Sequence, residues 1–221
     1  MKKNNLKISL ILNIIIVLFT IFALIVMFNG FKFMHGYDIV LESTSLSMFR
    51  FFTVDSNMFM GITSLIFVID EVNLLKGYKK EISRNHYILK LMGTSGVSLT
   101  FFIVFAYLGP ISKGGILSML MNSNLFFHLI IPLLSIITFI FFERNNKLSF
   151  KYSFYGIIPT LIYGLYYIIN VLIHVENGKV SPIYDWYWFV QNGIWTAIIV
   201  VPIIFLISYI ISLLLWKFNK K

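Results

Sequence analysis

The stretch "FFTVDSN", residues 51–57, places several polar side chains at the start of an apolar segment. Residues three and four apart share a helix face, so Thr53, Ser56 and Asn57 form one polar stripe, while Asp55 points elsewhere. A hydroxyl is a weak nucleophile and attacks a carbonyl only when a neighbouring base takes its proton. Thr53 is therefore a candidate nucleophile, and Ser56 is a rival hydroxyl, if the chain supplies a base at the same depth.

His128 is the candidate base. It lies in "SNLFFHLIIPLLSIITFIFFE", inside an apolar segment that enters the membrane from the same side as the Thr53 segment. His128 is about four residues into this segment, roughly 6 Å below the membrane surface at 1.5 Å per residue. An imidazole titrates near neutral pH and can accept a hydroxyl proton. Thr53 and His128 at matched depth predict base-assisted nucleophilic attack.

A third segment, "IIPTLIYGLYYIINVLIH", adds a polar and aromatic helix face with Asn170 and His174 at its outer end. Asn170 could orient His128. Asn57, Asn170 and the first backbone N–H groups of the Thr53 helix are candidate donors to a developing oxyanion. The predicted catalytic residues are Thr53 and His128, and the predicted supporting or substrate-binding residues are Asp55, Ser56, Asn57, Tyr163, Tyr167, Asn170 and His174.

Structural roles compete with this chemistry. The hydroxyl of Thr53 could cap the helix by accepting a backbone N–H. Asp55 in the first turn would then complement the helix dipole. His128 could serve as a structural hydrogen-bonding residue, and the tyrosines could form ordinary hydrogen bonds between helices.

Six apolar segments must position these residues. The chain has 221 residues, of which 58% are hydrophobic and 12% charged, whereas a soluble domain has about 45–50% and about 25%. A membrane-spanning helix needs about 20 apolar residues. Backbone groups in lipid must be paired within their segment, which favours helices. The sequence predicts an all-α, six-helix membrane bundle forming a single domain over 1–221, with helices at roughly 8–29, 53–70, 88–109, 125–142, 153–173 and 191–215.

The basic residues predict the orientation of the bundle. With the N-terminus inside, fourteen Lys and Arg lie on the inner side and four on the outer side, namely Lys32, Arg50, Lys113 and Lys179. Positive charge concentrates in cytoplasmic loops, so both termini should be cytoplasmic. The net charge of +9 then reflects topology and anionic lipid rather than nucleic acid. The aromatic run at 184–189 predicts an interfacial belt on the outer side.

Several other classes of site are excluded or disfavoured. The chain has no cysteine, which excludes disulfides, thiolate metal sites and cysteine nucleophiles. GxSxG, HExxH and phosphate-binding loop motifs are absent. His35, Asp38 and Glu42 would share a face if helical, but a single histidine is a weak metal signal, so exposed loop residues are the expectation. We expect neither a metal nor a cofactor.

The three quoted motifs, in this order, resemble the androgen-induced-gene and FAR-like family of six-helix membrane proteins, and are closest to its bacterial relatives. The resemblance covers about residues 45–175. It implies a membrane-embedded threonine and histidine that hydrolyse fatty acid esters of hydroxy fatty acids, matched here by Thr53 and His128. The excess of Lys over Arg, 15 to 3, is typical of an AT-rich bacterial genome and predicts a bacterial cell membrane.

The sequence thus predicts a hydrolase of lipid esters acting on a membrane lipid or acyl-chain substrate near the outer leaflet. The alternative is a lipid- or small-molecule-binding membrane protein or transporter without catalysis. A structural membrane protein without chemistry is a third class. The scarcity of charges within the predicted spans and the lack of an inverted repeat disfavour a transporter.

Overall fold

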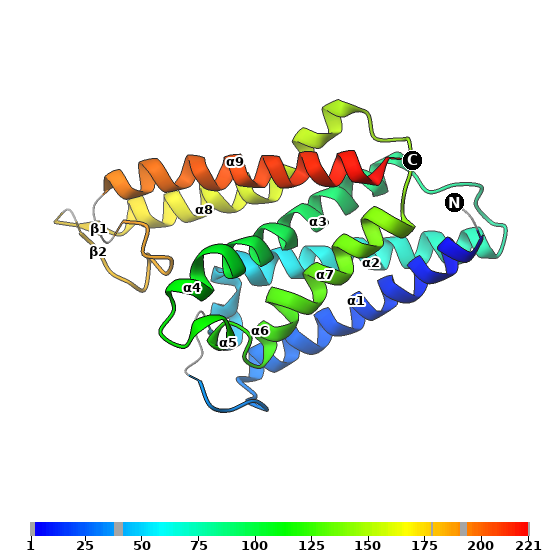
Figure 1. Cartoon of the computed structure of the whole chain (residues 1–221). Coiled ribbons are helices and arrows are strands. Elements are labelled where there is room, and N and C mark those ends of the chain that lie inside the picture. Colours follow the sequence, from blue (N-terminus) through cyan, green and yellow to red (C-terminus); the bar gives the residue numbers. More distant parts are fainter. Residues whose placement is uncertain (1–2, 38–41, 178, 191–193, 221) are drawn as a thin grey trace.

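The computed structural model describes residues 3–37, 42–177, 179–190 and 194–220. Six helical segments within these ranges are long and apolar enough to cross a membrane, as the sequence predicts. Both ends of the chain lie at the same end of the bundle (Figure 1), here called the terminal end. The opposite end, which carries α4, α5 and the β1–β2 hairpin, is called the distal end.

The first half of the chain forms three long helical segments. A short 3-10 helix, η1, precedes the second segment, and a π-helix, η2, interrupts the third. The elements are α1 (Lys3–Asn29), η1 (Ser45–Arg50), α2 (Phe52–Leu75), α3 (Arg84–Ile103), η2 (Val104–Leu108) and α4 (Gly109–Ile111). Because helices continue into their polar ends, α2 (Phe52–Leu75) and the third segment as a whole (Arg84–Ile111) are longer than the apolar runs 53–70 and 88–109 that predict them.

The second half of the chain contains the other three segments and a two-stranded antiparallel hairpin, in which Val175 pairs with Val180. The fourth segment alternates between α and π geometry, and the fifth begins as the 3-10 helix η5. The elements are α5 (Gly115–Ser118), α6 (Ser123–Leu125), η3 (Phe126–Ile130), α7 (Ile131–Ile137), η4 (Thr138–Phe142), η5 (Phe150–Ile157), α8 (Ile158–Ile173), β1 (Val175–Glu176), β2 (Lys179–Val180) and α9 (Ile194–Asn219).

Both π-helices of the distal half stand two residues before a proline. Val104–Leu108 precedes Pro110, and Phe126–Ile130 precedes Pro132. Proline has no N–H, and its ring clashes with the carbonyl four residues earlier. A wider π turn relieves that clash, which explains the same spacing in both segments.

The third segment is the central one. Of its most apolar window, 61% is buried, against 17% for α9. It contacts α2 and α7 on one side and η5 and α9 on the other, in agreement with its position in Figure 1. Its run of small residues permits these close approaches: a Cβ on Gly96 would lie 3.2 Å from the Cβ of Ser56 on α2. Apolar side chains cover much of the bundle's outside.

Candidate functional site at the distal end

The α2 helix begins without a side-chain cap. Its N-cap residue is Phe51, and no side chain caps it. Thr53 lies one residue inside the helix, so the prediction that its hydroxyl is the N-cap is wrong. The N–H of Phe52 instead donates to the phenol oxygen of Tyr187, 2.9 Å away. A residue 135 positions later in the chain therefore takes over the role that a cap residue usually has.

Backbone N–H groups of the first turn of α2 are candidate donors. The first N–H groups of a helix have no partner within that helix. The N–H groups of Val54 and Asp55 reach the carbonyl of Phe51 at 3.0 and 3.3 Å, and Tyr187 accepts from Phe52. The N–H of Thr53 belongs to the same turn and to the same half-buried residue as the candidate hydroxyl.

Asn57 links this turn of α2 to the fourth segment. Its side chain is completely buried, and its amide nitrogen donates to the carbonyls of Thr53 at 2.8 Å and of Phe127 at 3.1 Å. Phe127 is the neighbour of His128 in η3. Asn57 thus joins the turn that carries the candidate nucleophile to the turn that carries the candidate base. Both hydrogens of the amide are used, so Asn57 is not available as an oxyanion donor in this state.

His128 is buried, with 1% of its surface exposed. Its Nδ1 lies 2.6 Å from the carbonyl oxygen of Met119. A carbonyl oxygen can only accept, so Nδ1 carries the proton and Nε2 is the acceptor nitrogen. The distal loop between α4 and α6 therefore fixes the tautomer in which Nε2 can act as a base. This arrangement is also what a structural histidine would show.

Ser56, the rival hydroxyl, points towards α3. Its Oγ lies 3.3 Å from the Oγ1 of Thr100 and donates to the Thr53 carbonyl at 3.2 Å. Ser56 is 2% exposed, so its hydroxyl is already engaged inside the bundle. Asp55 is half-buried in the first turn of α2.

The polar residues of α8 bind η1 and the segment that follows the hairpin, rather than His128. The Tyr163 hydroxyl donates to the Arg50 carbonyl, and the Tyr167 hydroxyl donates to a carboxylate oxygen of Asp185. The Asn170 amide donates to the Tyr184 carbonyl at 2.7 Å. These contacts match the expectation of ordinary structural hydrogen bonds, and no hydrogen bond is recorded between Asn170 and His128 among the described residues.

His174 ends α8. Its ring stacks on Tyr184, with ring centroids 3.6 Å apart, and its Nδ1 lies 2.7 Å from the Asn170 carbonyl. Both outer residues of α8 therefore hold the loop that follows the hairpin.

The aromatic run at 184–189 closes the distal end instead of only facing lipid. Asp185 is fully buried and Trp186 is 6% exposed, whereas Trp188 is 56% exposed. The carboxylate of Asp185 accepts the N–H groups of Phe189 and Val190 at 2.9 and 3.1 Å, which folds the run into a compact turn. The predicted belt is thus a cover over α2 and α8 with an exposed edge.

Tyr187 is the residue of this cover that reaches the candidate site. Burial raises the pKa of Tyr187 to about 12. The phenol therefore keeps its proton at neutral pH, and its oxygen remains a neutral acceptor for the Phe52 N–H.

Metal binding finds no support in the described residues, where no group of three or more His, Asp or Glu is arranged to hold an ion. The stretch that contains His35 is not helical, so the shared face that the metal hypothesis requires does not form there. Asp38, the second member of that set, lies outside the described residues.

Sequence analysis missed a second group of polar residues in the terminal half of the bundle. Lys90 is one of the fourteen basic residues assigned to the inner side in the charge count. Glu71 and Glu143 each lie one residue beyond a predicted span. All three have 0% exposure, and the Lys90 ammonium lies 3.4 Å from the Glu143 carboxylate. The bundle therefore buries three charged residues, although charges are scarce within the predicted spans. The signal was Lys90 itself, a charged residue within an apolar run.

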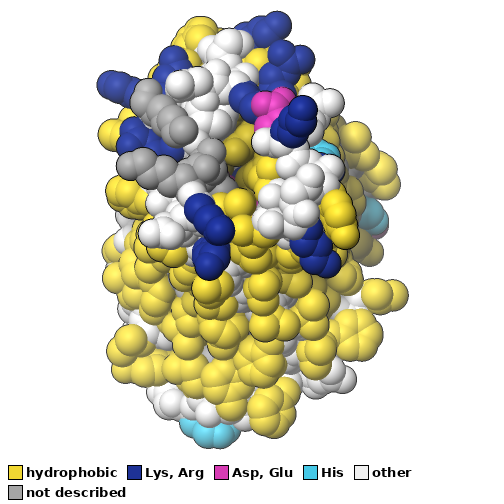
Figure 2. All heavy atoms as spheres, turned by 90° about the vertical axis from the view of Figure 1, so that its right-hand side faces the viewer, with side chains coloured by type: hydrophobic (Ala, Val, Ile, Leu, Met, Phe, Trp, Pro, Cys, Tyr) yellow, Lys and Arg dark blue, Asp and Glu magenta, His cyan; other side chains and the backbone are white. Residues whose placement is uncertain are grey.

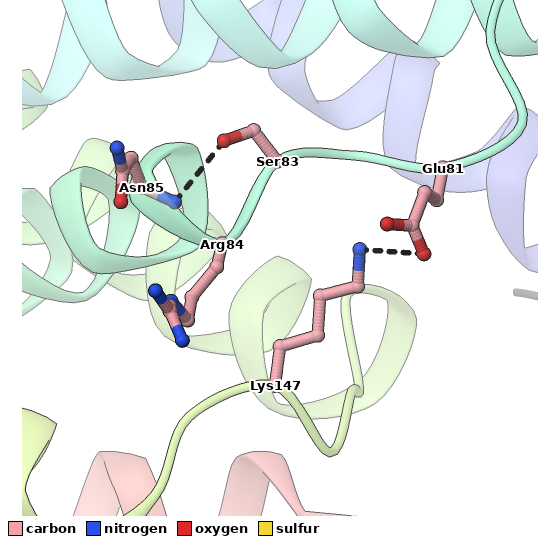
Figure 3. Close-up of a pocket in the computed structure, with 5 residues that line it drawn as sticks. All are labelled: Glu81, Ser83, Arg84, Asn85 and Lys147. Carbon is pink, nitrogen blue, oxygen red and sulfur yellow. Dashed lines mark hydrogen bonds and ion pairs between the residues drawn. The ribbon is translucent and has the colours of Figure 1, made fainter.

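The terminal end also carries an open hollow of about 460 Å³, lined by Glu81, Ser83, Arg84, Asn85 and Lys147 (Figure 3). Lys147 pairs with Glu81 at 2.9 Å, and Ser83 caps α3. Lys and Arg side chains gather on this end of the molecule (Figure 2). The hollow lies at the other end of the bundle from Thr53.

Comparison with protein-family models, with curated proteins and with solved structures finds no match to this chain. The class that the fold defines is a six-helix protein with the dimensions and composition of a multi-pass membrane protein. The motif resemblance to the androgen-induced-gene and FAR-like family stays a prediction.

Proposed function

We propose that this protein is a membrane-embedded hydrolase of lipid esters, with Thr53 as nucleophile and His128 as base. The observation that carries the proposal is the Asn57 bridge, which ties the Thr53 turn to the residue beside His128. The Nδ1–Met119 hydrogen bond adds support, because it leaves Nε2 of His128 as the proton acceptor.

The reaction would follow the general course of acyl transfer. The Thr53 oxygen attacks the ester carbonyl while its proton passes to His128 Nε2. The oxyanion that forms is stabilised by N–H donors, for which the Thr53 N–H at the positive end of the α2 dipole is the candidate. His128 then gives its proton to the departing alcohol, and water hydrolyses the acyl-threonine by the same steps.

The location suits a substrate that resides in the membrane. The charge asymmetry of the sequence predicts that the terminal end faces the cytoplasm and the distal end lies at the outer leaflet, and the membrane we propose is a bacterial cell membrane. Thr53 lies about one helical turn from the distal surface, where an acyl chain can approach from lipid and water from outside. The substrate class is a fatty-acyl ester.

The test is hydrolysis of a long-chain fatty-acyl ester by purified protein in detergent. Thr53→Ala and His128→Ala should each reduce the rate at least a hundredfold, because nucleophile and base act as a unit. Ser56→Ala is the matched control and should retain the rate, since its hydroxyl is engaged with Thr100. Equal rates in folded wild-type, Thr53→Ala and His128→Ala proteins would show that both residues are structural.

The second candidate function is binding or transport of a lipid or small molecule without catalysis. The buried Lys90, Glu71 and Glu143 favour it, because ionisable groups inside a membrane are costly and usually serve ligand or ion movement. This candidate predicts that ester hydrolysis is absent in the wild type, while Lys90 substitutions impair function.

A further inference from the structure

Six polar residues in the terminal half of the bundle form what we call the buried charged cluster. They come from α1, α2, α3 and the end of the fourth segment, and each has 0% exposure. Apolar side chains surround them, among them Phe67, whose ring centroid lies 5.1 Å from the Lys90 ammonium. The cluster consists of Ser9, Asn13, Ser64, Glu71, Lys90 and Glu143.

The Lys90 ammonium uses all three of its hydrogens within the cluster. It donates to the side-chain carbonyl of Asn13 and to the Ser64 hydroxyl at 2.9 Å, and it lies 3.4 Å from Oε1 of Glu143. An ammonium has three donors and no acceptor. Three acceptors in contact therefore indicate the charged form of Lys90.

The carboxyl groups of Glu143 and Glu71 differ in the number of hydrogen-bond donors around them. Oε1 of Glu143 accepts from Asn13 at 2.8 Å and from Ser9 at 3.4 Å, in addition to Lys90. Glu71 receives a long hydrogen bond from the Asn13 amide to Oε2 at 3.3 Å, and the Ser9 hydroxyl is a second donor near it. Among the described residues, Oε1 of Glu71 and Oε2 of Glu143 are buried without a hydrogen-bond partner. Glu143 is thus the counter-ion of Lys90, and Glu71 lacks the donors that a carboxylate needs.

Within the part of the chain that the structure describes, no cation other than Lys90 is paired with a carboxylate of the cluster. Asp70, next to Glu71, is paired with Lys79 and His86, each at 2.5 Å, at the edge of the bundle. Tyr87 on α3 is close enough to interact with Glu71 and Glu143 but is neutral in its ordinary state. One ammonium and two carboxylates would leave one uncompensated negative charge away from water, which costs several kcal/mol.

We propose that the buried charged cluster is a proton-binding site, and that Glu71 is the carboxyl group that holds the proton. The proton removes the excess negative charge. It also converts the unpaired Oε1 of Glu71 from an acceptor into a donor, and Oε2 of Glu143 is the cluster's remaining unpaired acceptor. Release of the proton would change the charge of the membrane interior by one unit. The site is independent of Thr53 and His128.

Infrared difference spectroscopy on purified protein tests the proposal. The wild type should show the C=O band of a protonated carboxyl at neutral pH, and the band should disappear at alkaline pH. Glu71→Gln should lack this band and remain folded, because glutamine reproduces the neutral group. Asp70→Asn is the matched control one residue away, and it should retain the band. Absence of the band in the wild type, or its persistence in Glu71→Gln, would overturn the proposal.

Thermal unfolding at a series of pH values gives a second, independent measurement. Folded protein holds a proton that Glu71 of the unfolded chain has released at neutral pH, so stability should fall as the pH rises. Glu71→Gln should remove this dependence. If Na⁺ in place of K⁺ at constant pH stabilises the wild type but not Glu71→Gln, the ligand is a metal cation and the proton assignment is wrong.

Discussion

Tyr187 connects the distal cover to the start of α2 through one hydroxyl. Tyr187→Phe would leave the N–H of Phe52 without its acceptor, and an unsatisfied buried donor costs about 1–3 kcal/mol. We therefore expect a lower midpoint in thermal unfolding of the detergent-solubilised protein. Tyr184→Phe is the control, because Tyr184 uses its ring and its carbonyl rather than its hydroxyl. Equal midpoints for Tyr187→Phe and wild type would contradict the cap assignment.

For single residues, the sequence predicts that Thr53, Ser56 and Asn57 share one helix face. It does not predict which residues form hydrogen bonds with this turn of the helix. Helical spacing is local and places three side chains on one face, of which Ser56 and Asn57 are buried. The partner of Phe52 lies 135 positions away, and no spacing rule reaches so far. The same is true of Asn170. Its amide donates to the carbonyl of Tyr184, which lies in a loop whose path the hydropathy pattern does not predict.

Among the elements, the junction of η5 with α3 and α9 has the closest packing. A Cβ on Gly156 would lie 2.5 Å from Oγ of Ser95 and 2.6 Å from Cβ of Ser212, and closer still to Oγ of Ser212. Gly156→Ala should therefore force α9 outward and destabilise the bundle by about 1–3 kcal/mol. The measurement is thermal unfolding in detergent.

Gly164→Ala is the matched control on the same segment. Its Cβ would meet only the far edge of the half-buried Phe205 ring, at 2.9 and 3.1 Å. A ring can turn away, whereas the Cβ of Ser212 moves only with its backbone. We expect a smaller loss than for Gly156→Ala. The reverse order would show that the η5 junction is more adaptable than its geometry indicates.

The sequence predicts that the six helical segments exist. It predicts only in part where they end and where they depart from α-helical geometry. Apolar length reveals all six segments, because burying backbone in lipid demands helices. It fails at polar ends: α2 runs to Leu75 rather than 70 and so includes Glu71, which the predicted span leaves out. The sequence places Pro132 inside the fourth segment. It does not show that the clash between the proline ring and the preceding turn is relieved by a π turn.

For the whole molecule, the charge asymmetry predicts which end faces the cytoplasm. Because the chain has no cysteine, single substitutions report position cleanly. Lys113→Cys at the distal end should react with a membrane-impermeant maleimide in intact cells, and Lys220→Cys at the terminal end should react only after permeabilisation. The opposite labelling pattern would invert the bundle and place Thr53 near the inner leaflet.

The buried charged cluster shows what composition cannot reveal about the whole molecule. Its charged members come from three segments: Glu71 and Glu143 look like boundary residues when their own segments are considered alone, and Lys90 looks like a single charge without a partner. Only assembly brings the Lys90 ammonium to within 3.4 Å of Glu143, 53 positions away. Removing Lys90 from the loop charges changes the asymmetry from fourteen to thirteen against four, so the predicted orientation is unchanged.

The central position of α3 has a consequence for biogenesis. This helix is made third, yet one of its sides contacts η5 and α9, which the ribosome produces last. Before α9 is made, the side of α3 that packs against it has no cover. A chain that stops before residue 194 would therefore lack α9 and leave that side of α3 exposed.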